Sequence, residues 1–142
     1  MKEISIKKYI RYLFALAIFA FILNKLILRS WVLESELPEF FKIIVLSIPN
    51  LVEAIVGTLL LTGILLQARQ YFSEYLEGIK DIHIYIISTG LAGIYGISQE
   101  YKLHNIGGNN VFDVNDVIAS ILGLIITLVA IIKYGFIEYK KK

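Results

Sequence analysis

The sequence predicts an all-α fold, a four-helix transmembrane bundle with both termini in the cytoplasm. Two observations predict it: the chain is more apolar than a soluble domain, and its apolar residues fall into four segments of spanning length. Hydrophobic residues make up 57% of the 142 residues and charged residues 18%, against about 45–50% and about 25% in a typical soluble domain. The length fits one domain, so residues 1–142 are expected to form a single integral membrane domain.

The composition also excludes several classes of protein. High hydrophobicity excludes an intrinsically disordered chain. The chain has no cysteine, which excludes a disulfide scaffold and a cysteine-ligated metal site. A net charge of +2 gives no support for binding nucleic acid. We therefore expect no nucleic-acid partner, and nothing in the sequence indicates a cofactor.

Four segments carry the expected spans, residues 12–28, 49–66, 82–98 and 116–136. A transmembrane helix needs about 20 mostly apolar residues, with a range of about 17–25. A soluble helical bundle is the alternative, but each of its helices would carry a polar face. Stretches such as Ala54–Leu66 and Ile118–Ile132 are apolar nearly all round, which favours the membrane.

Local helix chemistry predicts where the segments begin and end. The first follows a basic leader and lacks a well-placed cleavage site, as in an uncleaved signal anchor. Ser47 suits a helix N-cap and Pro49 an early helical position, so the second span is expected to start near Pro49. One long helix kinked at Pro49 is the alternative. Helical spacing continues beyond this span and is expected to end near Gly78, and Asn and Gly residues at 105–110 predict a turn before the fourth span.

The distribution of basic residues predicts the orientation, because cytoplasmic loops carry an excess of Lys and Arg. With four spans, ten of the 14 basic residues share one side of the membrane: Lys2, Lys7, Lys8, Arg11, Arg69, Lys80, Lys133, Lys140, Lys141 and Lys142. The other side holds Lys25, Arg29, Lys42 and Lys102. We therefore expect a multi-pass protein of the cell membrane (inner or plasma membrane). Aromatic residues fall where a belt anchors helix ends: Tyr9, Tyr12, Trp31, Tyr134 and Tyr139.

Polar residues gather at the opposite, outer boundary of the predicted bundle. They come from the ends of the second, third and fourth spans and form the candidate binding site: Asn50, Glu53, Gln99, Glu100, Asp113, Asp116 and Ser120. Asp116 and Ser120 are four residues apart and so share a helix face. A carboxyl inside a span, such as that of Glu53, must face the bundle interior, pair with a cation or stay protonated. The expected site is outward-facing and acidic.

Plainer roles compete with binding at several of these positions. Asp113 suits a helix N-cap, and Asp116 a first turn favoured by the helix dipole. Glu100 suits a solvated residue at a helix end, and Glu53 could pair with Lys102 or Arg29. The carboxylates are hard oxygen ligands, but their spacing selects no cation, so no metal site is predicted. No nucleophile elbow, phosphate loop or Ser/His/Asp order is present, so no catalytic residue is predicted and enzyme activity stays open.

Two short patterns carry a family resemblance. Gly96-x-x-x-Glu100 is followed by a glycine-containing loop and then by Phe112-Asp113-x-x-Asp116-Val117-Ile118-Ala119-Ser120-x-x-Gly123. This resembles the VanZ-like membrane proteins, in which a third-span glutamate and a short turn precede an Asp-x-x-Asp pattern, a small polar residue and a glycine. Pro49-Asn50-x-x-Glu53 stands where that family often has Asp-Lys-x-x-His. The match covers roughly Pro49 to Gly123.

The chain departs from that family at three places. Leu103 stands where a glutamine is common, Asn110 and Val111 replace a frequent arginine before the first aspartate, and the Asp-Lys-x-x-His element is not kept. The resemblance implies a four-span fold and a link to resistance against the glycopeptide antibiotic teicoplanin. It supplies no molecular mechanism.

Four functions fit these observations. The first is a VanZ-like protein whose outer site binds a cell-envelope component, such as a lipid-linked or cell-wall ligand, from within the lipid bilayer. The second is a small proton-coupled transporter that uses Glu53 and forms a homodimer to enclose a pathway. The third is a membrane-embedded, metal-dependent hydrolase or transferase. The fourth is an accessory subunit of a larger complex, packed through small residues: Gly57, Gly63, Gly90 and Gly93. We take the first as the prediction.

Overall fold

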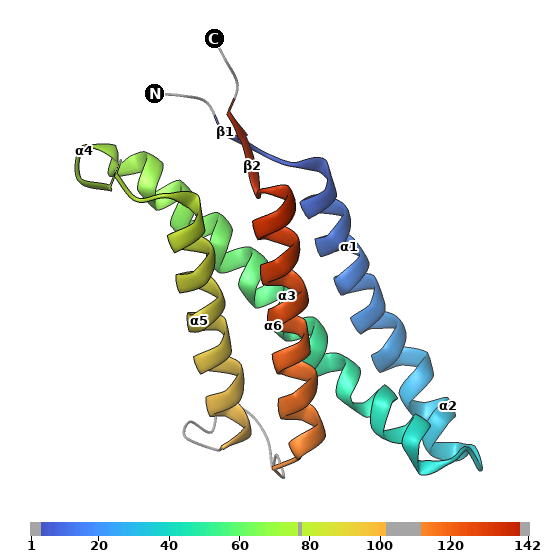
Figure 1. Cartoon of the computed structure of the whole chain (residues 1–142). Coiled ribbons are helices and arrows are strands. Elements are labelled where there is room, and N and C mark those ends of the chain that lie inside the picture. Colours follow the sequence, from blue (N-terminus) through green and yellow to red (C-terminus); the bar gives the residue numbers. More distant parts are fainter. Residues whose placement is uncertain (1–3, 77, 102–111, 140–142) are drawn as a thin grey trace.

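The computed structural model describes residues 4–76, 78–101 and 112–139, and these residues confirm a mostly helical fold. In chain order the elements are β1 (Ile4–Ile6), α1 (Lys8–Leu23), a π-helical segment η1 (Asn24–Leu28), α2 (Arg29–Glu34), α3 (Glu39–Tyr71), α4 (Ser73–Leu76), α5 (Asp81–Glu100), α6 (Val114–Tyr134) and β2 (Ile137–Tyr139). The central element is α3, which packs against α1, α5 and α6, and α5 also packs against α6. In Figure 1, α3 crosses behind α5 and α6 at a slant.

Three helical stretches are long and apolar enough to cross a membrane: Lys8–Glu34, Glu39–Tyr71 and Val114–Tyr134. α5 has 20 residues, a length of about 30 Å that matches the hydrocarbon core of a bilayer, about 30 Å. Large apolar side chains stay uncovered on the outer faces of the helices, for instance Leu16 (64% exposed) and Ile94 (69% exposed). Such an extensive apolar surface is typical of contact with lipid rather than with water.

The second predicted span is longer than expected, and the predicted start near Pro49 is wrong. α3 has 33 residues, begins at Glu39 and contains Pro49 in its interior, which confirms the continuous helix of the alternative but not its kink. Ser47 is buried inside this helix and is not an N-cap. At 1.5 Å per residue α3 is about 50 Å long, which exceeds the thickness of the hydrocarbon core.

A side chain from another helix allows α3 to continue through Pro49. Proline has no N–H, so it cannot bond to the carbonyl four residues earlier, which belongs to Val45. The Nδ2 of Asn24, in η1, donates a hydrogen bond of 2.7 Å to that carbonyl. Asn24 is fully buried. The first helical stretch continues through it to Glu34 and does not end at residue 28 as predicted.

The C-terminal end of α3 comes earlier than expected. The helix ends at Tyr71, not near Gly78, and the separate short helix α4 follows. Arg69 explains the return of the chain, because its Nη1 donates to the Ile79 carbonyl at 2.6 Å and its Nη2 pairs with Asp81 Oδ1 at 2.7 Å. Arg69 thus fixes the segment that leads into α5.

The segments nearest the two termini pair with each other, which local sequence patterns did not predict. β1 and β2 are antiparallel, with Ile4 opposite Tyr139 and Ile6 opposite Ile137. The predicted fourth span, 116–136, ends earlier, at Tyr134, because Gly135 adopts a φ of +72° that leaves the helix. The two strands lie at the same end of the molecule (Figure 1).

Tyrosines hold β2 and the end of α6 in place. The Tyr139 hydroxyl donates to Asp81 Oδ1 at 3.0 Å and accepts from Arg69 Nη2 at 3.0 Å. Partial shielding from water and the Asp81 carboxylate raise the pKa of Tyr139, so it stays a donor at neutral pH. The Tyr9 hydroxyl donates to the Gly135 carbonyl at 2.7 Å, so Tyr9 is part of this packing, whereas Tyr12 is exposed as a belt residue should be.

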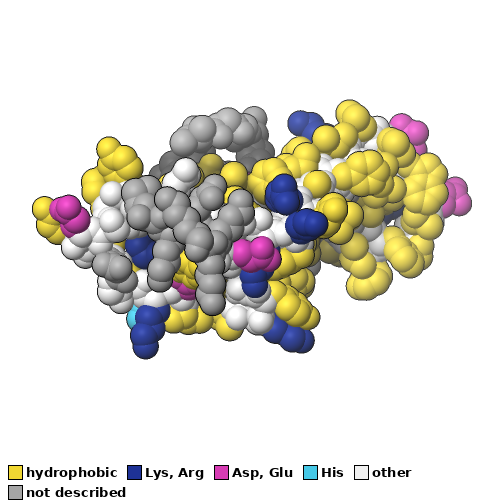
Figure 2. All heavy atoms as spheres, turned by 90° about the horizontal axis from the view of Figure 1, so that it is seen from above, with side chains coloured by type: hydrophobic (Ala, Val, Ile, Leu, Met, Phe, Trp, Pro, Cys, Tyr) yellow, Lys and Arg dark blue, Asp and Glu magenta, His cyan; other side chains and the backbone are white. Residues whose placement is uncertain are grey.

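The end that carries β1 and β2 is rich in basic residues. Figure 2 looks onto this end and shows Lys and Arg side chains on it, with hydrophobic side chains around them. The described basic residues in the elements and turns that meet here are Lys7, Lys8, Arg11, Arg69, Lys80 and Lys133. The predicted turn at 105–110 lies outside the described residues.

Candidate functional site

A groove of about 640 Å³ runs between α3 and α5. One wall is a face of α3 on which residues recur every three or four positions, as one helix face requires: Asn50, Glu53, Gly57, Leu60 and Ile64. The second wall belongs to α5, and α6 contributes Ser120 and Leu124. This groove, here called the α3–α5 groove, falls within the volumes of about 300–1,000 Å³ typical of small-molecule sites.

The groove is polar at one end and apolar along the rest of its length. The polar end is formed by candidate residues from three helices: Asn50, Glu53, Gln99, Glu100 and Ser120. The apolar part is lined by Leu60, Leu61, Ile64 and Leu91. The structure therefore joins a hydrogen-bonding end to a hydrocarbon-like channel.

A second hollow of about 340 Å³, here called the end hollow, adjoins the polar end. Arg29, Asp113 and Asp116 line it. Asn50 and Glu100 line both the end hollow and the α3–α5 groove. Each of the seven predicted binding residues thus lines at least one of the two hollows.

Glu100 is the centre of the predicted cluster. Its side chain is only 7% exposed, so the plainer role of a solvated residue at a helix end is wrong. The backbone of Asp113 hydrogen-bonds to the Glu100 carboxylate, and the charges of Asp116, Asp113 and Glu53 act on it. The start of α6 and a position well inside α3 therefore bring three carboxylates, those of Asp113, Asp116 and Glu53, into electrostatic range of Glu100.

The two aspartates have different surroundings. Asp113 is exposed and caps α6, since its Oδ1 accepts from the Asn115 backbone N–H at 2.8 Å, so the predicted N-cap is confirmed. Asp116 lies in the first turn of α6, where a negative charge is favoured by the helix dipole. Asp116 lines the end hollow and Ser120, one turn deeper, lines the α3–α5 groove.

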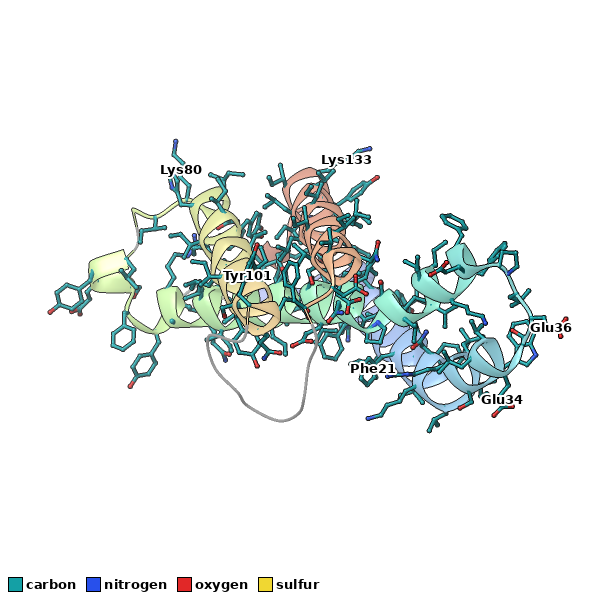
Figure 3. All side chains as sticks on the ribbon, turned by 90° about the horizontal axis from the view of Figure 1, so that it is seen from below. Phe21, Glu34, Glu36, Lys80, Tyr101 and Lys133 are labelled. Carbon is teal, nitrogen blue, oxygen red and sulfur yellow. The ribbon has the colours of Figure 1, made fainter. Side chains whose placement is uncertain are left out.

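The carboxylates have no cationic partner among the residues that the structure describes. The ion pair found among the described residues, Arg69 with Asp81, lies at the opposite end of the molecule. Glu53 is exposed toward the groove and does not form the considered pair with Arg29, and Lys102 lies outside the described residues. Figure 3 is the view from below, onto the end of the molecule where α5 ends and α6 begins. The acidic residues Glu34 and Glu36 lie away from Tyr101 in this view, at the edge formed by α2 and the segment after it.

Gly123 sets the position of α6 beside this site. A Cβ at residue 123 would lie 2.5 Å from the Leu51 carbonyl oxygen and 3.0 Å from the Ala54 Cβ. The absence of a side chain therefore lets α6 touch the backbone of α3 between Asn50 and Glu53. Of the other glycines, Gly93 is also close-packed, since a Cβ there would lie 3.0 Å from Leu124 Cδ1, whereas a Cβ at Gly90 would meet nothing within 4 Å.

Sequence reasoning missed Arg29 as a lining residue and missed the apolar walls of the groove. The three- and four-residue spacing on α3 could have indicated that these residues form one wall of a groove. That α5 forms the facing wall follows only from the slant of α3. Among the described residues no group of three or more His, Cys, Asp or Glu side chains is arranged to hold a metal ion. The arrangement can accept hydrogen bonds and attract positive charge beside an apolar channel.

No family model matches the chain, and no curated protein and no solved structure matches it.

Proposed function

We propose that this protein is a VanZ-like, four-span membrane protein that binds an amphipathic component of the cell envelope in the α3–α5 groove. The observation that carries the proposal is the groove itself, with Glu53, Gln99 and Glu100 at one end and leucine and isoleucine walls beyond. A site that presents polar groups and hydrocarbon together suits a lipid or lipid-linked molecule, because each part of the ligand finds matching surroundings.

The pairing of β1 with β2 supports four spans. Two segments from opposite ends of the chain can pair only if they lie on the same side of the membrane, which requires an even number of crossings. Three stretches qualify as spans by length and hydropathy, so α5, which has spanning length and packs against α3 and α6, is the fourth. Its lower hydropathy follows from polar residues such as Ser88 and Thr89, which are buried and hydrogen-bonded inside the bundle.

The charge distribution supports cytoplasmic termini. Basic residues gather at the end that carries β1 and β2, and this end faces the cytoplasm under the positive-inside rule. The polar end of the groove lies at the other end of the bundle, so the proposed ligand comes from the outer leaflet.

Cysteine labelling tests this topology, since the chain has no cysteine of its own. Glu36→Cys places a thiol at an exposed position between α2 and α3, and Glu138→Cys places one at an exposed position in β2. In intact cells a membrane-impermeant maleimide should label the Glu36→Cys variant, and the Glu138→Cys variant only after permeabilisation. Equal labelling of both in intact cells would contradict the proposed orientation.

Blocking the groove tests the binding function. Gly96 lines the groove, and a Cβ there would meet nothing within 4 Å, so Gly96→Leu puts an isobutyl group into the channel without a clash at its Cβ. Gly90→Leu on the same helix is the matched control, because Gly90 is exposed, meets nothing within 4 Å and does not line the groove. Native mass spectrometry of protein in maltoside micelles should find bound lipid in wild type and Gly90→Leu, reduced about tenfold in Gly96→Leu. Equal retention in all three would overturn the proposal.

A further inference from the structure

The dimensions of the α3–α5 groove match one hydrocarbon chain of one leaflet. Its α3 wall runs from Asn50 to Ile64, about 21 Å at 1.5 Å per residue. One leaflet contributes half of a hydrocarbon core of about 30 Å. The wall therefore has room along it for a whole acyl chain, with the polar end of the groove at the level of the head group.

The charge at the polar end selects the head group. Four carboxylates lie there, those of Glu53, Glu100, Asp113 and Asp116, and no described Lys or Arg forms an ion pair with them. Arg29 is the described cationic residue that lines the end hollow. An anionic head group would meet repulsion from these carboxylates, whereas a cationic one complements them.

Glu100 adds a geometric requirement. The residue is more than nine-tenths buried and borders both hollows. A carboxylate has about four acceptor positions, and the Asp113 backbone occupies one of them. Because burying a charge without partners is costly, a ligand that donates several N–H groups suits this position better than one without donors.

We propose that the occupant of the α3–α5 groove is a phospholipid with a primary-amine head group, whose ammonium donates to Glu100 and whose acyl chain lies along α3 and α5. The inference rests on the proposed function and names the ligand class of the same site. A primary ammonium carries both three N–H donors and a positive charge. A quaternary ammonium has the charge but no N–H group, and a glycerol head group has no positive charge. Arg29, in the adjoining end hollow, supplies positive charge for the lipid phosphate.

Lipids that differ only in the head group test the proposal. Phosphatidylethanolamine, phosphatidylcholine and phosphatidylglycerol with the same two acyl chains are titrated separately against the delipidated full-length protein in maltoside micelles, with binding measured by native mass spectrometry. Phosphatidylethanolamine should bind at least about tenfold more tightly than the other two, the gain expected for charge-assisted hydrogen bonds. Equal affinities, or tighter binding of phosphatidylglycerol, would overturn the proposal.

Charge variants show whether Glu100 is responsible. Glu100→Gln keeps the shape of the side chain but removes its charge, and the preference for phosphatidylethanolamine should fall to about twofold or less. Asp116→Asn should lower the preference by a smaller factor and takes the place of Glu100→Gln if that variant does not fold. Glu39→Gln is the control, because Glu39 is exposed at the start of α3 and lines neither hollow, so the preference should persist. A preference that survives both Glu100→Gln and Asp116→Asn would contradict the assignment.

The groove-blocking variant separates this inference from the proposed function. If Gly96→Leu abolishes binding of all three lipids equally and wild type shows no preference, the groove binds lipid but the head-group assignment is wrong. If Gly96→Leu binds all three lipids as wild type does, the groove is not the site and both proposals fail.

Discussion

Replacing Gly123 with alanine should destabilise the protein by about 1–3 kcal/mol, the usual range for forcing an extra methyl group into a packed interface. The new Cβ would lie 2.5 Å from the Leu51 carbonyl oxygen, a backbone atom that cannot rotate away. α6 must therefore move away from α3, and the movement should also widen the polar end of the groove, since Leu51 lies between Asn50 and Glu53. Unfolding in a detergent mixture of increasing SDS content, followed by circular dichroism, measures the loss.

Two comparisons make that experiment specific. Gly90→Ala adds the same methyl group where nothing lies within 4 Å, so it should be neutral or stabilising by up to about 1 kcal/mol through helix propensity. Ala54→Gly combined with Gly123→Ala should not restore stability, because removing the Ala54 Cβ leaves the clash with the Leu51 carbonyl in place. Wild-type stability of Gly123→Ala would show that the α3–α6 spacing adjusts freely, contrary to the packing described.

Replacing Asn24 with leucine should cost about 1–3 kcal/mol, the penalty for leaving a partly buried carbonyl without a donor. The carbonyl is that of Val45, which Pro49 cannot satisfy and which now accepts from Asn24 Nδ2. The same substitution should cost about 1 kcal/mol less in a Pro49→Ala background, where the new N–H at residue 49 can bond to Val45. Asn24 and Pro49 are thus predicted to be energetically coupled.

A double-mutant cycle of Asn24→Leu and Pro49→Ala measures this coupling with the same unfolding assay. Thr58→Val is a suitable control in place of Asn24→Leu, because Thr58 is also fully buried but bonds to Ala54 within its own helix. Its cost should be the same with and without Pro49. Strict additivity of Asn24→Leu with Pro49→Ala would show that the Asn24 side chain does not compensate for the proline.

The fold could be predicted as far as local patterns reach. Apolar segments of spanning length predicted the positions of α1, α3, α5 and α6, and Asp113 was recognised as a cap because its partner Asn115 is two residues away. Ser47 and Pro49 misled the prediction because the rules for helix starts consider only neighbouring residues. The donor that allows α3 to continue, Asn24, lies 21 residues from its acceptor.

The candidate site was predictable in part for a topological reason. Helix ends on one side of a bundle must meet, so Glu100 and Asp116 could be placed together from the order of the spans. Glu53 was grouped with them because the second span was expected to start near Pro49, whereas it lies well inside α3. Which hollow each side chain lines could not be predicted, because it depends on how α3 slants across α5 and α6 (Figure 1). The apolar walls gave no distinct signal, since lipid-facing and groove-facing leucines have the same pattern.

The pairing of β1 with β2 has a consequence for synthesis. β2 follows every helix in the chain, so β1 has no partner until the ribosome has made residues 137–139. The β1–β2 pairing therefore forms after all the described helices have been synthesised, and long-range contacts of this kind form late. Chains that stop just before β2 would contain all the described helices, with α1 held near Asn24 and, through the hydrogen bond from Tyr9 to the Gly135 carbonyl, near its start. Such chains would lack only the strand that pairs with β1.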